Sequence, residues 1–87
     1  MYYVYLLQSI PIGKLYMGYT KDLRARLNEH NQRKSIATKA AVPFELVYYE
    51  AYRSKKDALR RERQLKRYKQ GYTRLKERLT FSLAGQN

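Results

Sequence analysis

Three β-prone segments constrain the fold of this chain most strongly. Residues 2–7 (YYVYLL) and 14–19 (KLYMGY) are rich in tyrosine and branched apolar residues, and a loop with Pro11 and Gly13 separates them. Two such runs around a Pro- and Gly-containing loop predict a β-hairpin. A third run, residues 44–50, follows Pro43, which biases Val42 to extended geometry. The three segments together predict one small sheet.

A first helix is predicted between the hairpin and the third strand, at about residues 21–32. Thr20 is a suitable N-cap residue, and Asp22 falls in the first turn. Leu23 and Leu27 then share one helical face. A basic, irregular stretch follows and ends at Val42. This stretch is long enough to be a binding loop.

Two further helices are predicted after the third strand. The segment Ser54-Lys-Lys-Asp57 is typical of a capping box, and Gly71 interrupts the helical pattern behind it. A short third helix is then marked by apolar residues at helical spacing, namely Tyr72, Leu75 and Leu79. We therefore expect an α+β fold of order β-β-α-β-α-α in a single domain (1–87), with a core at about 2–68 and a C-terminal helix and tail at 69–87.

Charge indicates the class of partner. Nineteen Lys and Arg residues against seven Asp and Glu leave a formal net charge of +12. Such density favours a polyanion, and nucleic acid is preferred over an anionic membrane because the basic residues surround the helices rather than forming one polar face. No segment is apolar enough to span a membrane. The absence of cysteine excludes disulfides and thiolate sites and is compatible with the cytoplasm, where we expect the protein.

One acidic residue stands out in the second helix. A single helical stripe is formed by Ala58, Leu59, Glu62, Leu65 and Lys66. The stripe places the Glu62 carboxylate in the middle of an inward face. A buried carboxylate is costly unless it is paired or holds a cation. Two interpretations follow: an internal salt bridge, or a ligand for a hard cation such as magnesium.

Two other groups carry residue types suited to phosphate chemistry. Arg26 and His30 are four residues apart and share a helical face, so that an arginine able to clamp phosphate lies beside a group that titrates near neutrality. Tyr5 and Tyr16 lie on the two strands of the hairpin, and Gly18 inside the second strand is typical of a close backbone approach. Taken singly, these residues are more often surface side chains or cross-strand packing pairs.

Taken together, these residues resemble the GIY-YIG nuclease family, in particular its short bacterial single-domain members, which are related to the N-terminal domain of an excision-repair nuclease. Tyr3-Val4-Tyr5 stands where the family has its GIY tripeptide, and Tyr16-Met17-Gly18 where it has YIG. The resemblance extends over residues 3–66. Three departures accompany it: Tyr3 replaces a glycine, Tyr19 replaces a lysine of the repair nucleases, and residues 69–74 lack an asparagine found in some members.

The resemblance implies a role for five residues. Glu62 would hold one Mg²⁺ or Mn²⁺ ion, and Arg26 would offset charge on the transition state. Tyr5 would activate the attacking water, with Tyr16 or His30 as a rival base or proton relay. The expected activity is hydrolysis of a phosphodiester bond, in DNA rather than RNA, with low sequence specificity because no second domain reads bases. All five side chains are expected to converge on one concave face.

The remaining basic residues are expected to bind the nucleic acid backbone. They are Arg33, Lys34 and Lys39 in the loop and Arg60, Arg61, Arg63, Lys66, Arg67 and Lys69 in the second helix and just beyond it. Lys66 has a second interpretation, because it follows Glu62 by one turn and can support the site or simply pack its stem. Two alternatives to a nuclease stay open: a family member that binds nucleic acid without cutting it, and a ribosome-associated or regulatory basic protein with an unrelated fold.

Overall fold

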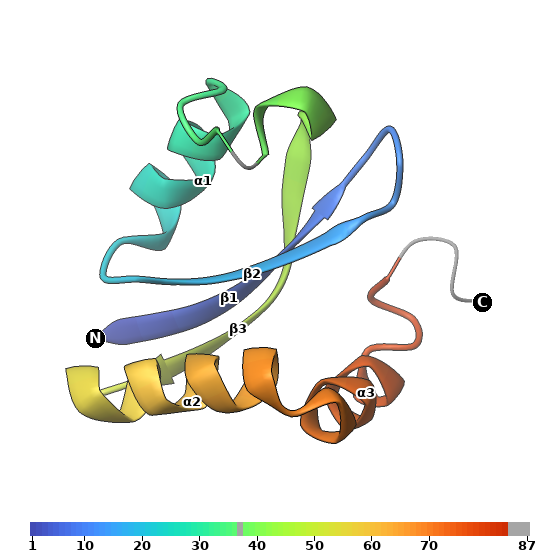
Figure 1. Ribbon diagram of the computed structural model, residues 1–87. Helices are drawn as coiled ribbons and strands as arrows, with labels where there is room; N and C mark the ends of the chain where they lie inside the picture. Colours follow the sequence, from blue (N-terminus) through green and yellow to red (C-terminus); the bar gives the residue numbers. More distant parts are fainter. Residues whose placement is uncertain (37, 84–87) are drawn as a thin grey trace.

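The computed structural model describes residues 1–36 and 38–83, and these residues form a three-stranded antiparallel sheet with helices on both sides (Figure 1). The predicted order β-β-α-β-α-α and the α+β class are confirmed. The elements are β1 (Tyr2–Ser9), β2 (Leu15–Thr20), α1 (Leu23–Asn31), β3 (Phe44–Tyr52), α2 (Lys55–Arg67) and α3 (Lys69–Arg78), with a short 3₁₀ turn, η1 (Lys39–Ala41), before β3. The part of the predicted tail beyond residue 83 lies outside the described residues.

The strand order β2-β1-β3 places β1 in the centre of the sheet. Every residue from 4 to 9 is buried, because β1 pairs with a strand on each side and is covered on both faces. A continuous apolar run such as VYLL is typical of a strand in that position. Tyr5 therefore has two direct neighbours across the sheet, Gly18 on β2 and Tyr49 on β3.

The two faces of the sheet have separate cores. In Figure 1, α1 lies on one side of the sheet and α2 on the other. The core on the α2 side is formed by Val4, Leu6, Ala58, Leu65, Leu75, Leu79 and Leu83. The core on the α1 side is smaller and is formed by Tyr5, Leu7, Ala41 and Phe44. None of the helices in the described part of the chain is long and apolar enough to cross a membrane.

Helix α1 begins two residues later than predicted, because Asp22 and not Thr20 is its N-cap. The Asp22 carboxylate accepts a hydrogen bond from the Ala25 backbone N–H at 3.1 Å, whereas the Thr20 hydroxyl accepts from the Asp22 N–H at 3.1 Å. The helix ends at Asn31, and Arg33 adopts a left-handed conformation (φ 62°) whose N–H donates to the His30 carbonyl at 3.0 Å. The Asn31 side chain then ties the helix to the Phe44 backbone at 2.7 and 3.1 Å.

Two predictions about α2 and α3 are wrong in detail. Ser54 is the N-cap residue of α2, but its side chain makes no capping hydrogen bond, so the predicted capping box is not formed. The break between the two helices lies at Tyr68, whose backbone is extended (φ −107°, ψ 104°), and not at Gly71, which is inside the first turn of α3. Glycine is tolerated there because the first helical turn makes few internal hydrogen bonds.

Candidate active site

The contact between Tyr5 and Gly18 shapes the site. The two residues face each other across β1 and β2, and a Cβ built at Gly18 would overlap the hydroxyl end of the Tyr5 side chain. Glycine at this position therefore lets a phenol from the central strand lie across the edge strand β2. This close approach explains why a residue that weakens strands is found in the middle of β2.

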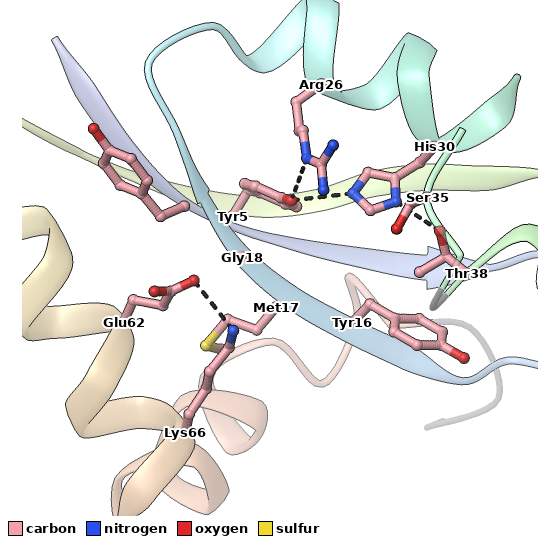
Figure 2. A pocket seen from close by; sticks show the side chains of 11 residues that line it. Tyr5, Tyr16, Met17, Gly18, Arg26, His30, Ser35, Thr38, Glu62 and Lys66 are labelled. Carbon is pink, nitrogen blue, oxygen red and sulfur yellow. Dashed lines mark hydrogen bonds and ion pairs between the residues drawn. The ribbon is translucent and has the colours of Figure 1, made fainter. Parts of the chain in front are cut away.

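The Tyr5 hydroxyl meets two side chains from α1. Arg26 Nε donates to Tyr5 Oη at 3.3 Å, and His30 Nε2 lies 3.1 Å from the same oxygen. Figure 2 shows both α1 side chains pointing at this hydroxyl. The four-residue spacing of Arg26 and His30, predicted to place them on one helical face, thus brings a cation and an imidazole to the same phenol.

His30 is held by a second contact that the sequence does not reveal. Its side chain is buried, and its Nδ1 lies 2.7 Å from the hydroxyl of Thr38, which is also buried. In the tautomer with the proton on Nδ1, His30 donates to Thr38 and leaves Nε2 to accept from Tyr5. Burial lowers the pKa of His30, and the nearby Arg26 lowers it further, while Glu29 opposes them. The imidazole is therefore neutral at pH 7.

Arg26 stays cationic in this setting. Its hydrogen bond to Tyr5 raises the pKa of the guanidinium, burial acts against this, and the bond to Glu29 raises the pKa further. The second bond runs from Nη1 to Glu29 Oε2 at 2.9 Å, one turn along the helix. The remaining N–H groups of the guanidinium can donate to a phosphate in the cavity that Arg26 lines.

Glu62 approaches from the other side of β2. Figure 2 shows β2 passing between the α1 side chains and the α2 pair of Glu62 and Lys66. Lys66 Nζ lies 3.2 Å from Glu62 Oε2, and the Glu62 side chain is only 18% exposed, whereas that of Lys66 is 53% exposed. The inward carboxylate predicted from the α2 stripe is therefore present, and it has a lysine as its ion-pair partner.

All five side chains with a predicted role line one cavity of about 240 Å³, here called the Tyr5–Glu62 cavity. Its described walls comprise Tyr5, Tyr16, Met17, Gly18, Tyr19, Arg26, His30, Ser35, Thr38, Glu62 and Lys66. Sequence reasoning missed Ser35 and Thr38, which come from the irregular basic stretch. No periodic signal marks them, because they reach the site only when that stretch folds back onto α1.

Tyr16 contributes to the wall differently from Tyr5. Its ring packs edge-on against Phe44, with the centroids 5.2 Å apart, and Lys14 Nζ lies 5.3 Å from the ring centroid. In Figure 2 its phenol oxygen points away from the Tyr5 hydroxyl. The two tyrosines thus share the cavity without sharing hydrogen-bond partners among the described side chains.

The cavity fits a hard cation that needs few protein ligands. No group of three or more His, Cys, Asp or Glu side chains is suitably placed to hold a metal within residues 1–36 and 38–83. Glu62 is the one carboxylate among the described residues that line the cavity. Magnesium commonly takes one or two protein carboxylates and completes its shell with water and substrate phosphate. A single oxygen ligand that faces a phosphate-sized space meets that requirement.

The basic residues expected to bind nucleic acid fall into two environments. Arg60, Arg63, Arg67 and Lys69 on α2 and α3 are exposed, as are Arg33, Lys34 and Lys39 near the end of α1 and in η1. Arg61 is different, because its Nε and Nη2 donate to the two Glu50 oxygens of β3 at 2.9 and 3.0 Å. Its guanidinium is therefore engaged inside the fold and holds α2 against the sheet.

Two tyrosines complete the Glu50 site. The Tyr48 and Tyr52 hydroxyls both donate to the Glu50 carboxylate. Burial would raise the pKa of Glu50, but the hydrogen bonds from Arg61, Tyr48 and Tyr52 outweigh it and lower this pKa. Burial and the bonds to Glu50 raise the pKa of both tyrosines to about 12, so they remain donors.

Comparison with known proteins identifies the family of the chain. The model of the GIY-YIG catalytic domain matches residues 1–77. A UPF0213 protein of Staphylococcus epidermidis is 44% identical over 68 residues, which cover 77% of this chain and 82% of the relative. A UPF0213 protein of Staphylococcus aureus is 42% identical over the same shares. No solved structure is significantly similar to the chain.

The family match covers nearly the whole chain, and both motif tripeptides lie within it. It excludes a basic protein of unrelated fold. The chain therefore belongs to the GIY-YIG family, a family of nucleases whose members typically use a divalent metal.

Proposed function

We propose that the protein is an endonuclease that hydrolyses DNA phosphodiester bonds with one divalent cation. The observation that supports this most directly is the Tyr5–Glu62 cavity. A phenol, an imidazole, a guanidinium and a carboxylate, all predicted from the family resemblance, line the same space of about 240 Å³. Each is suited to one task in phosphodiester hydrolysis, and a phosphate can contact several of them at once.

Tyr5 is the preferred residue for activating the attacking water. Its hydroxyl proton has an acceptor in neutral His30 Nε2, 3.1 Å away, so Tyr5 can pass its proton to His30 as it takes one from water. The water oxygen forms a bond to phosphorus, and the bond from phosphorus to the 3′ oxygen breaks. The proton lost by water passes to Tyr5 as the Tyr5 proton passes to His30, and the leaving oxygen takes a proton from solvent. Tyr16 is the weaker candidate because its ring is packed on Phe44.

Arg26 and Glu62 would help to offset the negative charge that develops during cleavage. Arg26 would donate to the phosphate oxygens as negative charge grows in the transition state. Glu62 would hold Mg²⁺ or Mn²⁺, which when bound offsets charge on the phosphate and on the leaving oxygen. Lys66 can swing away from Glu62 for this, since its side chain is 53% exposed.

Low sequence specificity is part of the proposal. The exposed cations of α2 and α3 would neutralise phosphates, which fixes position on the backbone but carries no base information. Selectivity would then depend on the shape of the DNA, as suits an enzyme of repair or recombination that acts on flaps, branches or single strands.

A second function, binding of nucleic acid without cleavage, has one observation in its favour. The ion pair with Lys66 at 3.2 Å already neutralises Glu62, as a purely structural carboxylate would require. In that case the basic surface would bind DNA or RNA for a partner that supplies the chemistry. Dependence on metal separates the two functions.

A cleavage assay tests the proposal. Labelled single-stranded, duplex, flap and branched DNA and an RNA control are incubated with the protein in Mg²⁺, Mn²⁺ or EDTA. Glu62→Gln is compared with Glu77→Gln, which changes an exposed carboxylate on α3 that is away from the cavity. Metal-dependent cleavage that is lost in Glu62→Gln and kept in Glu77→Gln supports the nuclease. Tight, salt-sensitive binding with no cleavage of any substrate would replace it with the binding function.

A further inference from the structure

Two tyrosines on the α1 side of the sheet are not used by either core. Tyr3 shares a face with Tyr5 because the two are two residues apart on β1, and Tyr49 shares it because it pairs directly with Tyr5 from β3. Neither Tyr3 nor Tyr49 belongs to a core cluster of the described residues. The Tyr49 side chain is 51% exposed, although it sits in the middle of a strand.

The two rings form one aromatic surface. Their centroids are 5.8 Å apart, and the planes meet at 69°, so the edge of one ring faces the other. This arrangement holds the rings in place while it leaves ring area open to solvent. Tyr3 is also the residue that replaces glycine in the first family tripeptide, so this surface depends on a departure from the family pattern.

Positive charge lies at the same end of the sheet. Tyr3 pairs with Thr20 on β2 and with Ala51 on β3. Lys21 directly follows Thr20, and Arg53 comes two residues after Ala51; both are exposed. Among the described residues neither forms an ion pair. Cations at the same end of a sheet as open aromatic rings are a combination suited to single-stranded nucleic acid, where the cations neutralise phosphates and the rings stack on bases.

We propose that Tyr3 and Tyr49 bind an unpaired base of the substrate strand, close to the phosphodiester held at Tyr5 and Arg26. The inference rests on the proposed function and adds a substrate class to it, namely single-stranded or locally unpaired DNA. Bases inside a duplex stack on one another and present no open face to a protein ring. A duplex would therefore gain nothing from this surface unless its bases were first unstacked.

Equilibrium binding tests the proposal without relying on cleavage. Fluorescence anisotropy is measured in EDTA with a labelled single strand and with the fully paired duplex of the same length. Tyr49→Leu removes the aromatic ring, Tyr49→Phe keeps it, and Tyr3→Leu tests the second ring. The matched control is Phe81→Leu, because Phe81 is an exposed aromatic residue (89%) that follows α3.

We expect Tyr49→Leu to weaken single-strand binding roughly tenfold, as loss of one stacked base does elsewhere. Tyr3→Leu should act in the same direction, Tyr49→Phe should bind like the unchanged protein, and duplex affinity should change less than about twofold. Equal losses for single strand and duplex, or no loss, would overturn the proposal, as would an equal loss in Phe81→Leu.

The outcome is separable from that of the proposed function. Cleavage without a Tyr49-dependent preference for single strands leaves the nuclease and rejects the stacking surface. A Tyr49-dependent preference in a protein that cleaves nothing supports the stacking surface and rejects the nuclease. Circular dichroism and thermal unfolding of each variant establish that it is folded.

Discussion

The phenol of Tyr5 occupies the space that a side chain at Gly18 would need. The two residues are partners in the β1–β2 ladder, and any Cβ at position 18 would overlap the hydroxyl end of the tyrosine. This relationship links a backbone requirement in one motif tripeptide to the position of the reactive group in the other. It also explains how a residue on the central strand takes part in a cavity that reaches across the edge strand.

Gly18→Ala should therefore displace Tyr5 from Arg26 and His30. We expect a loss of about 1–3 kcal/mol in the free energy of unfolding from overpacking, and a fall of about 100-fold in cleavage from misplacement of the phenol. Gly71→Ala is the control, because nothing lies within 4 Å of its added Cβ. That change should stabilise α3 by about 0.5–1 kcal/mol. Urea titration measures both values, and equal behaviour of the two variants would contradict the close contact.

Tyr5→Phe and Tyr16→Phe should separate the two tyrosines. Tyr5→Phe removes the hydroxyl that contacts Arg26 and His30, and we expect cleavage to fall about 100-fold or more. Tyr16→Phe keeps the ring packed on Phe44. Its loss of cleavage should therefore be at least about tenfold smaller than the roughly 100-fold loss expected when one positioned acid–base group is removed. Single-turnover cleavage rates at saturating protein measure the difference. A larger loss in Tyr16→Phe would assign the base to Tyr16.

His30 should make stability depend on pH below neutrality. Burial and Arg26 lower its pKa in the folded protein below the usual 6.5, so the unfolded chain binds a proton first as pH falls. The free energy of unfolding should therefore be highest above pH 6.5 and decrease as pH falls from 6.5 through the folded pKa. Urea titrations from pH 8 to 5 should show this slope, and His30→Gln should reduce it. An unchanged slope in the variant would assign the effect to other groups.

Glu50 should make the free energy of unfolding depend on pH in a lower range than His30 does. The bonds from Arg61, Tyr48 and Tyr52 outweigh burial and hold its pKa below 4.5 in the folded protein, so its contribution is present above pH 4.5. That contribution should be lost as pH falls from 4.5 through the folded pKa. Acid unfolding followed by circular dichroism tests this, with Glu50→Gln expected to be less stable at pH 7 and flatter below pH 4.5.

The neighbouring arginines of α2 should differ sharply in their effect on stability. Arg61→Ala leaves the mostly buried Glu50 carboxylate without its cation, and we expect a loss of about 2 kcal/mol, less than for a fully buried pair because Arg61 is partly exposed. Arg60→Ala breaks an exposed pair with Asp57 and should cost less than about 1 kcal/mol. Binding should show the opposite order, because Arg60 is the exposed cation. Denaturation and DNA-binding measurements on both variants check the reversal.

Local pattern predicted much of this molecule. Two β-prone runs around Pro11 and Gly13 form the hairpin, and the spacing of Arg26 and His30 puts both on one helical face. The stripe around Glu62 places that carboxylate inward. These features depend on residues close in sequence, where the periods of helix and strand decide which side chains lie together. For the same reason the order of elements and the class of fold could be predicted.

Only the tertiary structure decided the contacts between distant segments. Thr38 reaches His30 because the irregular stretch folds back over α1, and Arg61 meets Glu50 because α2 packs against β3. The start of α1 also differs from the predicted one, since Asp22 rather than Thr20 caps the helix. The sequence by itself determined which residues are available for chemistry, through local periodicity and motif spacing. Packing determined which of them meet, because such contacts join residues that no local period relates.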